Sequence, residues 1–479
     1  MKRARGPSPV LLGLLMLAAW CSAARAAEGE PEAEAEAEAE EDEKEPVLTI
    51  PQDDRRAGEE GSEEVEQILG LLAESELTKY VDEVGQRLAR NAPRTFDYTF
   101  RVVDQEVPNA FALPGGFVFV SRGLLLLANN EDELANVLGH EIVHVASRHA
   151  AARQHIVKGV PGIFQFMQMG SLAAYGREQE RIADRLGQGL AGLAGYDPYG
   201  MASFMKSLNF SERLTLGASR LPSFRDTHPS SGERVGASAD RAGRIAWERR
   251  PAIAASREEY LERIDGLAVG ISASEGVFRG DRFLHPDLGF TVRFPTGWQT
   301  QNTHTAVAAV SPDRSASLVL EGGGKPPLEE AARKYVEKSA REGLKVHAVE
   351  RIVLAGEPAL RARGSAAGLH VIIHWVQFRD SIYRLSGASL SRHHEGIILN
   401  FARSFRPLPP ELLDTITETR LRIARARAGE TLGQLSQRTG NVWDLQTTSV
   451  MNGVFTGEAL QEGQALKIAL EEPYRPRER

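Results

Sequence analysis

The segment His140-Glu141-Ile142-Val143-His144 constrains this chain more than any other feature of its sequence. It lies in a stretch whose apolar residues recur at helical spacing. A helix is expected to begin near Asn130, because a cap residue followed three positions later by Glu133 is a capping-box-like start. Residues four apart lie on the same helix face, so the pattern predicts a helix that presents His140 and His144 together. The apolar stripe of this helix consists of Leu134, Val137, Leu138 and Val145.

The two histidines can offer imidazole nitrogens to one metal ion. Zinc suits two imidazoles and a carboxylate with a fourth position left open, and Glu141 stands beside the ligands, where it can take a proton from an activated water. The alternative is a helix with two hydrogen-bonded histidines. With only 12 histidines in 479 residues, this pattern rarely arises by chance on such a helix. We therefore predict one Zn2+ per chain, bound by His140 and His144, with Glu141 as the catalytic base.

The third ligand must come from elsewhere in the chain. The glycine and histidine that would follow His144 in one class of metallopeptidases are absent, and His149 is expected to face away from the ligand stripe. Residues 177–184 offer two glutamates, Glu178 and Glu180, on a second predicted helix. An exposed charged helix is the alternative interpretation of this segment, and the residues alone leave the choice open.

Residues 1–26 have the pattern of a secretory signal peptide. Their apolar run, residues 10–20, is far shorter than the roughly 20 residues of a spanning helix, and Ala24-Arg25-Ala26 supplies small residues at the cleavage positions. Cys21, the only cysteine, follows Trp20, which disfavours lipidation. Cleavage after Ala26 would exclude both a disulfide scaffold and a thiol nucleophile. The positive residues of the segment are Lys2, Arg3, Arg5 and Arg25.

The net charge of −8 comes mostly from one short run. Residues 28–45 hold eleven acids and one lysine, a charge of −10, and the signal segment contributes +4, which leaves about −2 for the rest of the chain. Residues 27–50 are therefore expected to be an acidic disordered linker. The rest carries no domain-wide basic footprint, so no nucleic-acid partner is predicted.

Length and pattern together predict several modules in the remaining chain. Residues 51–270 should form one domain with amphipathic helices and a few strands, including a strand pair joined by the turn Pro114-Gly115-Gly116. Near residue 275 the pattern changes to an α+β module, residues 280–406, with strands around 290–295, 316–320, 370–375 and 381–385 and a helix over 328–342. Prolines 407, 409 and 410 mark a linker before a last unit, residues 418–471.

Four blocks in the first domain carry a family resemblance. They are Asn109-Ala110-Phe111-Ala112-Leu113-Pro114-Gly115-Gly116, Gly139 to His144, Glu180-Arg181-Ile182-Ala183-Asp184, and Thr227-His228-Pro229-Ser230 with Glu233-Arg234. With these blocks the region resembles the HtpX/Oma/BepA-type zinc metallopeptidases (peptidase family M forty-eight), closest to the periplasmic BepA-like branch. The resemblance implies a mainly α, zincin-like (gluzincin) domain with a small β-sheet.

The resemblance also implies roles for individual residues. Glu180 would be the third zinc ligand, and Asp184, one turn further on, would orient a ligand histidine. Asn109, Ala110, Phe111 and Ala112 would form the edge strand on which a substrate peptide lies. His228 would reach the metal as a gating ligand. Arg234 would hold that loop or stabilise the oxyanion in catalysis.

The two C-terminal modules carry weaker resemblances. Phe294-Pro295-Thr296-Gly297-Trp298 is similar to the start of α/β domains of the PsbP/Mog type, for which a binding or scaffold role is expected. Residues 418–471 resemble a LysM module, a βααβ unit that binds N-acetylglucosamine-containing glycans, through Ala428-Gly429-Glu430-Thr431-Leu432, Met451-Asn452-Gly453 and residues 460–468. Residues 439–450 depart from that pattern, so peptidoglycan binding stays an open alternative.

These features together predict a periplasmic metalloendopeptidase of protein quality control. Its expected partners are unfolded outer-membrane or periplasmic proteins, with peptidoglycan as a further partner through the last module. Two alternatives remain at this stage: a cell-wall-associated binding protein with a latent peptidase domain, and a peptidoglycan hydrolase.

Overall fold

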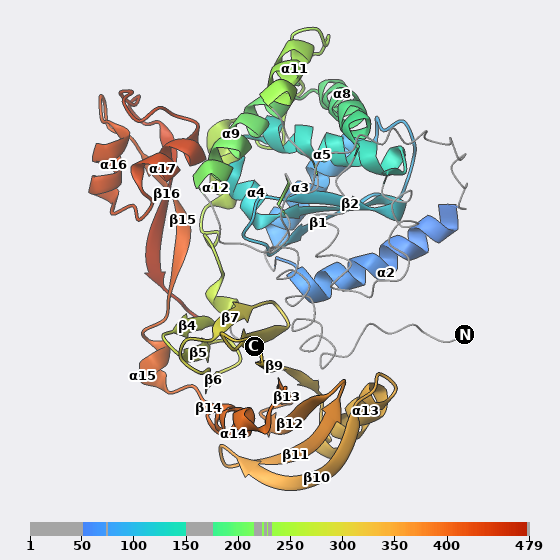
Figure 1. Cartoon of the computed structure of the whole chain (residues 1–479). Coiled ribbons are helices and arrows are strands. Elements are labelled where there is room, and N and C mark those ends of the chain that lie inside the picture. The colour runs from blue at the N-terminus through green and yellow to red at the C-terminus, as the bar shows by residue number, and fades with distance from the viewer. Residues whose placement is uncertain are drawn as a thin grey trace, which may run out of the picture. The chain divides into compact units, whose positions relative to one another are not determined.

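The computed structural model describes residues 51–72, 75–149, 176–214, 223–224, 228 and 232–476. They form two compact units (Figure 1), which we call the helical unit, residues 51–272 with Thr417–Glu472, and the sheet unit, Ala273–Ile416 with residues 473–476. The chain thus combines helices with several sheets, as predicted. The predicted signal peptide and acidic linker lie outside the described residues. Across the described ranges, no helix has the length and apolar character needed to cross a bilayer.

The helical unit begins with two helices and a small sheet. Helices α2 (Pro51–Leu69) and α3 (Ser75–Ala89) precede three strands in the order β1-β3-β2. Strand β1 (Thr99–Val103) runs parallel to β3 (Phe117–Ser121), and β2 (Ala110–Leu113) pairs antiparallel with β3 and lies at the sheet edge. The short helix η1 (Pro114–Gly116) joins β2 to β3, and Gly115 and Gly116 have φ of 78° and 100°, which glycine adopts without strain.

The helices that the described residues form after the sheet are α4 (Arg122–Leu127), α5 (Glu131–Ala146), α8 (Arg177–Ala194), α9 (Gly200–Leu214), α11 (Gly232–Ala242) and α12 (Arg257–Ile264). The predicted start of α5 is confirmed, because the Asn130 side chain accepts a hydrogen bond from the Glu133 backbone N–H at 2.9 Å. Glu133 does not return the bond to Asn130. Its carboxylate accepts from the backbone N–H of Asn129 at 2.9 Å and from the Ser203 hydroxyl of α9. The cap therefore also fixes α5 to α9.

Helices α5 and α8 cross at a pair of glycines. A Cβ on Gly187 would lie 2.8 Å from the backbone nitrogen of His140, and one on Gly139 would lie 2.8 Å from the Gly187 carbonyl oxygen. Such contacts are closer than real Cβ atoms make, so the two helices pack backbone to backbone only because neither residue has a side chain. The crossing is one turn from His144 on α5 and from Asp184 on α8.

Replacing Gly187 with alanine is expected to force the helices apart. The added methyl would have to push backbone atoms, and overpacking of this kind costs about 1–3 kcal/mol in the free energy of unfolding. Gly189→Ala on the same helix is the matched control, since its Cβ meets nothing within 4 Å, and removing a helical glycine stabilises by about 0.4–1 kcal/mol. Urea unfolding of both variants measures the difference. Equal midpoints would contradict the close crossing.

Residues 417–472 return to the helical unit as a βααβ segment. Its elements are β15 (Thr417–Arg425), α16 (Leu432–Thr439), α17 (Leu445–Asn452) and β16 (Ala465–Pro473), and β15 and β16 form a two-stranded sheet. Asn452, at the end of α17, accepts a hydrogen bond from the Lys467 backbone N–H and donates one to its carbonyl, at 2.7 and 2.8 Å. The element order is the one predicted for this module.

The βααβ segment shares a hydrophobic core with the helices. Leu421 and Ala465 are buried in the same cluster as the apolar residues of α3, α4 and α5. The Lys467 ammonium is fully buried and donates hydrogen bonds to the carbonyls of Leu126, Leu127 and Ala128, at 2.8 to 3.2 Å. These carbonyls belong to the last turn of α4, where the helix itself offers them no donors, and burial lowers the pKa of the Lys467 amine well below its ordinary value. Lys467 lies in the segment that the sequence predicts as a separate module. It thus provides the hydrogen bonds that the carbonyls at the C-terminal end of α4 would otherwise lack.

The sheet unit is built on a seven-stranded sheet in the order β10-β11-β12-β13-β9-β8-β7 and a four-stranded sheet in the order β14-β6-β5-β4. Helix α13 (Leu328–Ala340) packs on one face of the larger sheet and α14 (Glu395–Arg403) on the other. The remaining bounds are β4 (Val277–Arg279), β5 (Arg282–His285), β6 (Phe290–Arg293), β7 (Gln299–Asn302), β8 (Ala306–Val310), β9 (Ala316–Gly324), β10 (Lys345–Leu354), β11 (Glu357–Ala366), β12 (Leu369–Phe378), β13 (Ser381–Ser389), β14 (Arg406–Pro407) and the short helix α15 (Pro410–Leu413).

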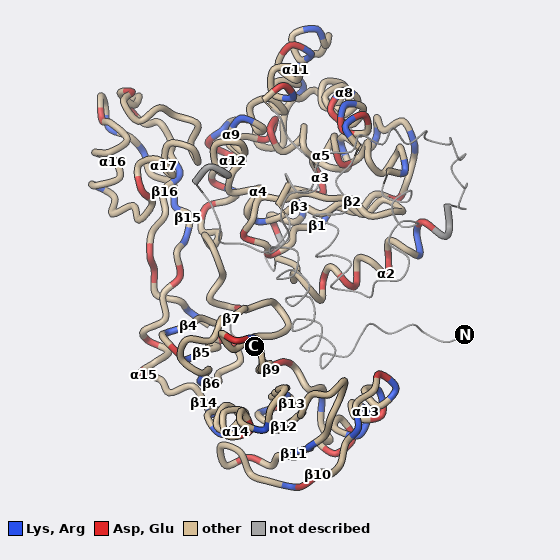
Figure 2. Tube along the Cα trace, in the orientation of Figure 1, with Lys and Arg blue, Asp and Glu red and all other residues tan. Residues whose placement is uncertain are grey.

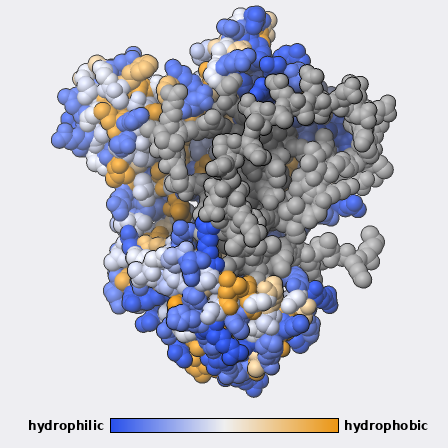
Figure 3. All heavy atoms as spheres, viewed as in Figure 1, coloured by the Kyte–Doolittle hydropathy of each residue, from blue (hydrophilic) through white to orange (hydrophobic). Residues whose placement is uncertain are grey.

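The four predicted strands and the predicted helix of this module are confirmed as β6, β9, β12, β13 and α13. Residues of both charge signs lie on helices α2, α8, α11 and α13 (Figure 2). On the face drawn in Figure 3 most of the described surface is hydrophilic, and the apolar side chains gather in small patches.

Candidate metal centre

Four side chains from three parts of the helical unit converge on one buried point. His140, His144, Glu180 and His228 each offer a ligand atom, and these atoms all lie within 4.8 Å of one another. His140 and His144 come from α5, and their Nε2 atoms lie 3.0 Å apart. Helix α8 contributes Glu180, whose carboxylate oxygens lie 3.6 Å from His140 Nε2 and 3.4 Å from His144 Nε2. The structure therefore brings the three predicted ligands together across the glycine crossing.

His228 completes the cluster from outside these two helices. Its Nδ1 lies 2.9 Å from Glu180 Oε1 and 3.2 Å from His140 Nε2. Its ring stacks on Phe224, with centroids 4.4 Å apart, and its backbone N–H donates to the Phe224 carbonyl. The residue predicted as a gating ligand is thus placed within reach of the same point as the other three.

Asp184 fixes the orientation of His140. The Asp184 carboxylate lies 3.1 Å from His140 Nδ1, on the side of the ring that faces away from the cluster. Burial lowers the pKa of His140, which favours the neutral imidazole. A proton on Nδ1, facing Asp184, leaves the lone pair of Nε2 directed at the cluster, which is the form a metal requires.

Arg234, from α11, holds the two acids of α8. Its guanidinium makes a bidentate pair with Asp184 at 2.7 and 2.9 Å and lies 2.9 Å from Glu180 Oε2. Burial would raise the pKa of Asp184, but the hydrogen bonds from His140 and Arg234 outweigh it and keep the pKa well below its ordinary value. Arg234 also donates to the His228 carbonyl at 3.4 Å. The structure places it where it can hold His228, one of the two roles expected for it.

Glu141 is fully buried next to the cluster. Its Oε1 lies 3.3 Å from His228 Nε2. Because Glu141 follows His140 on the helix, its side chain leaves α5 at a different angle from the ligands and stands beside them. This is the position predicted for the base.

His149 is the functional neighbour that sequence reasoning missed. It is buried, and its Nδ1 lies 2.9 Å from His144 Nδ1. His149 therefore contacts the Nδ1 of one ligand histidine, just as Asp184 contacts the Nδ1 of the other, His140. A histidine five residues beyond His144 is off the helical face of the ligands, and helical spacing gave no reason to expect it near them. The backbone of Arg148 has φ of 56°, outside the helical region, so a continuous helix is the wrong assumption at this point.

The predicted substrate strand is the edge strand of the small sheet. Ala110, Phe111 and Ala112 lie in β2, which within the described ranges pairs only with β3. Their side chains are buried, as is that of Asn109, whose backbone N–H and carbonyl bond to Ser121. Phe224, which stacks on His228, donates its backbone N–H to the carbonyl of Pro108, just before this strand.

The donor set fits a zinc ion. Imidazole nitrogen and carboxylate oxygen are zinc ligands, and three such groups with a replaceable fourth are the pattern of a catalytic site. Two imidazoles and a carboxylate with a second glutamate beside them are the ligand arrangement of the H-E-x-x-H metallopeptidases. Residues 75–242 match the family model described as Peptidase family M48.

Several curated proteins are similar to the chain over the same region. The "Beta-barrel assembly-enhancing protease" of Yersinia pestis is 31% identical over 220 residues, 40% of this chain and 43% of that protein. The "Mitochondrial metalloendopeptidase OMA1" of Schizosaccharomyces pombe is 30% identical over 174 residues, 33% of this chain and 51% of that protein. The chain thus spans about half the length, or less, of these relatives.

One solved structure is weakly similar to part of the chain. The solution structure of cyanobacterial PsbP from Synechocystis covers 30% of this chain and 98% of that protein, with 12% identity and a TM-score of 0.23. A TM-score at this level does not establish a shared fold. The PsbP/Mog assignment of residues 280–406 stays a prediction.

Asp184→Asn is expected to weaken metal binding without unfolding the chain. Asparagine keeps the size of the side chain but removes the charge that faces His140 and Arg234, and loss of such a supporting carboxylate costs about 10–100-fold in metal affinity. Competition with a chromogenic zinc chelator measures this directly. Asp240→Asn, at an exposed position of α11, should leave the affinity unchanged. Equal affinities of the two variants would contradict the role of Asp184.

Proposed function

We propose that this chain is a zinc-dependent metalloendopeptidase that cleaves misfolded or stalled proteins of the bacterial envelope. The observation that carries the proposal is the buried cluster of His140, His144, Glu180 and His228 with Glu141 beside it. His140, His144 and Glu180 would hold the ion. When bound, zinc supplies a Lewis acid that lowers the pKa of water and polarises a carbonyl.

The residues of the chain supply the proton transfer and the positioning. Glu141 accepts a proton from the attacking water on a carboxylate oxygen and delivers it to the amine that leaves, so that one C–N bond breaks and one C–O bond forms. Asp184 and Arg234 keep His140 and Glu180 in place during the reaction. Strand β2 offers an edge to which a substrate peptide would add as a further strand.

Two features support the bacterial envelope as the place where the proposed enzyme acts. Residues 1–26 have the pattern of an export signal. Relatives that share the domain are named for enhancing β-barrel assembly, which fits a substrate class of unfolded outer-membrane or periplasmic proteins. We therefore place the enzyme in the periplasm.

Exchange of the base tests the reaction. Glu141→Gln is expected to retain one zinc per chain and to lower the cleavage of casein and of an unfolded outer-membrane protein at least about 10²–10⁴-fold. Glu178→Gln, exposed on α8, is the matched control and should cleave like the unaltered protein. Treatment with a chelator should abolish cleavage in both active proteins. An unchanged rate in the Glu141 variant would exclude the proposed mechanism.

His228 is proposed to block the fourth ligand position until substrate enters. Its contacts with Glu180 and Glu141 occupy the space that a water and a scissile carbonyl need. A blocked site has low activity because only the fraction of open molecules can bind substrate.

His228→Ala is accordingly expected to raise casein cleavage, by roughly tenfold if about a tenth of the molecules are open at any time. Zinc content by atomic absorption should stay at one per chain, since three ligands remain. A variant that loses both zinc and activity would instead identify His228 as an indispensable ligand.

A second proposal concerns the wall. The βααβ order of residues 417–473 is that of a LysM module, which favours association of the enzyme with peptidoglycan. Co-sedimentation of the full-length Glu141→Gln protein with purified sacculi tests this association. Recovery of all the protein in the supernatant would exclude it, and release of sacculus fragments by the unaltered protein would instead favour a peptidoglycan hydrolase.

A further inference from the structure

The larger sheet of the sheet unit ends in a long edge strand. Strand β10 (Lys345–Leu354) is the outermost of the seven, and among the described residues it pairs only with β11. An edge strand presents backbone N–H and C=O groups on its open side, which can pair with a further strand. Proteins commonly protect such edges with charges at outward positions, and β10 has valines at two of them.

Those valines lie on the face of the sheet that α13 covers only in part. Val349 and Val353 are 54% and 69% exposed. They pair in register with Ala362 and Pro358, and Arg351 between them pairs with Leu360. Because alternate residues of a strand share a face, Val349, Arg351 and Val353 all point to the side on which α13 packs.

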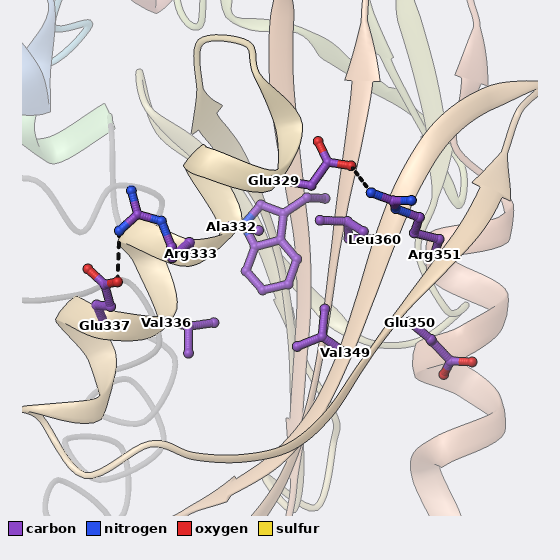
Figure 4. Close-up of a pocket in the computed structure, with 10 residues that line it drawn as sticks. Glu329, Ala332, Arg333, Val336, Glu337, Val349, Glu350, Arg351 and Leu360 are labelled. Carbon is purple, nitrogen blue, oxygen red and sulfur yellow. Dashed lines mark hydrogen bonds and ion pairs between the residues drawn. The ribbon is translucent and has the colours of Figure 1, made fainter.

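A cavity of about 420 Å³ lies between α13 and β10 (Figure 4). Figure 4 shows Val336 and Ala332 on the helix side of this cavity and Val349 on the strand side, and Leu360 comes from the neighbouring strand β11. Trp375 also lines the cavity, so that most of its lining between the charged rim residues is apolar.

The charges around the cavity neutralise one another. Arg333 pairs with Glu337 at 2.9 Å, and Arg351 with Glu329 at 3.1 Å (Figure 4). The remaining acid of the rim, Glu350, accepts hydrogen bonds from Arg361 and Arg363 of β11. Each rim charge therefore already has a counter-charge, and the site offers no unmatched charge to select a charged ligand. Its occupant is apolar.

We infer that the groove between β10 and α13 binds an extended apolar segment of an unfolded polypeptide, which adds to β10 as a further strand. The open edge provides main-chain hydrogen bonds, and the cavity accepts a side chain from the segment. In strand addition the main-chain bonds supply affinity and the side-chain pocket supplies specificity. The inference rests on the proposed function only where it calls the bound polypeptide a substrate. Binding of the segment to the groove requires no catalytic activity. The groove would then hold substrate at a second place, apart from the metal centre.

The test uses the full-length Glu141→Gln protein, in which binding is measured without cleavage. The probe is a fluorescent ten-residue peptide of alternating valine and threonine, followed by anisotropy. Val349→Lys places a charge on the lining of the cavity, and Val353→Lys places one further along the same exposed face of β10. Each should weaken binding roughly tenfold or more, as for a central contact of an interface. Leu390→Lys is the matched control, since Leu390 is 61% exposed in the same unit and does not line the cavity.

The outcomes separate this inference from the proposed function. If both valine variants bind the peptide as tightly as the Leu390 variant while their thermal unfolding is unchanged, the groove is not the binding site. If sedimentation shows a dimer that Val349→Lys dissociates, a second copy of the chain occupies the edge and the inference is wrong. Loss of peptide binding in the valine variants would support the groove even if the unaltered protein cleaved no substrate, a result that would overturn the proposed function alone.

Discussion

The metal centre depends on the close contact of α5 and α8. Gly139 and Gly187 let the two backbones approach until a methyl group would clash with the backbone of His140. Only at this separation does the short side chain of Glu180 reach the two histidines, and Asp184 the far side of His140. A larger residue in place of Gly139 or Gly187 would change the distances from Glu180 and Asp184 to the histidines at the same time. The packing of two helices thus sets the geometry of the ligands before any metal contributes.

The charges of the centre are arranged around that contact. Three acids (Glu141, Glu180 and Asp184) and four imidazoles (His140, His144, His149 and His228) share a buried space, and Arg234 is a cation that the structure places against two of the acids. A buried carboxylate without a counter-charge would be protonated and lose its value as a ligand or an orienting group. Arg234 keeps Asp184 ionised and also bonds the His228 carbonyl, so α11 links the supports of the ligands to the proposed gate.

The sequence predicted most of what local pattern controls. The cap at Asn130, the strand pair around Pro114 and the helix face of His140 and His144 follow from spacing alone. The choice of Glu180 over Glu178 came from a family resemblance, because both lie on one helix and spacing does not say which faces α5. His149 was missed because the chain leaves helical geometry at Arg148. Strand β10 was missed because an edge strand exposed on both faces lacks the alternation that marks a half-buried one.

The buried ammonium of Lys467 has a consequence for how the chain reaches its native state. The helical unit is interrupted by the whole of residues 273–416, and the strand that carries Lys467 comes more than 330 residues after the carbonyls it binds. Contacts between residues so distant in sequence form late, because the entropy cost of closing a long loop comes before the stabilisation that the contacts provide. The end of α4, which leads directly into α5, therefore stays incomplete until the last strand has been made and docked. For the proposed peptidase, this order of assembly would leave little opportunity to cleave its own chain while that chain is still unfolded.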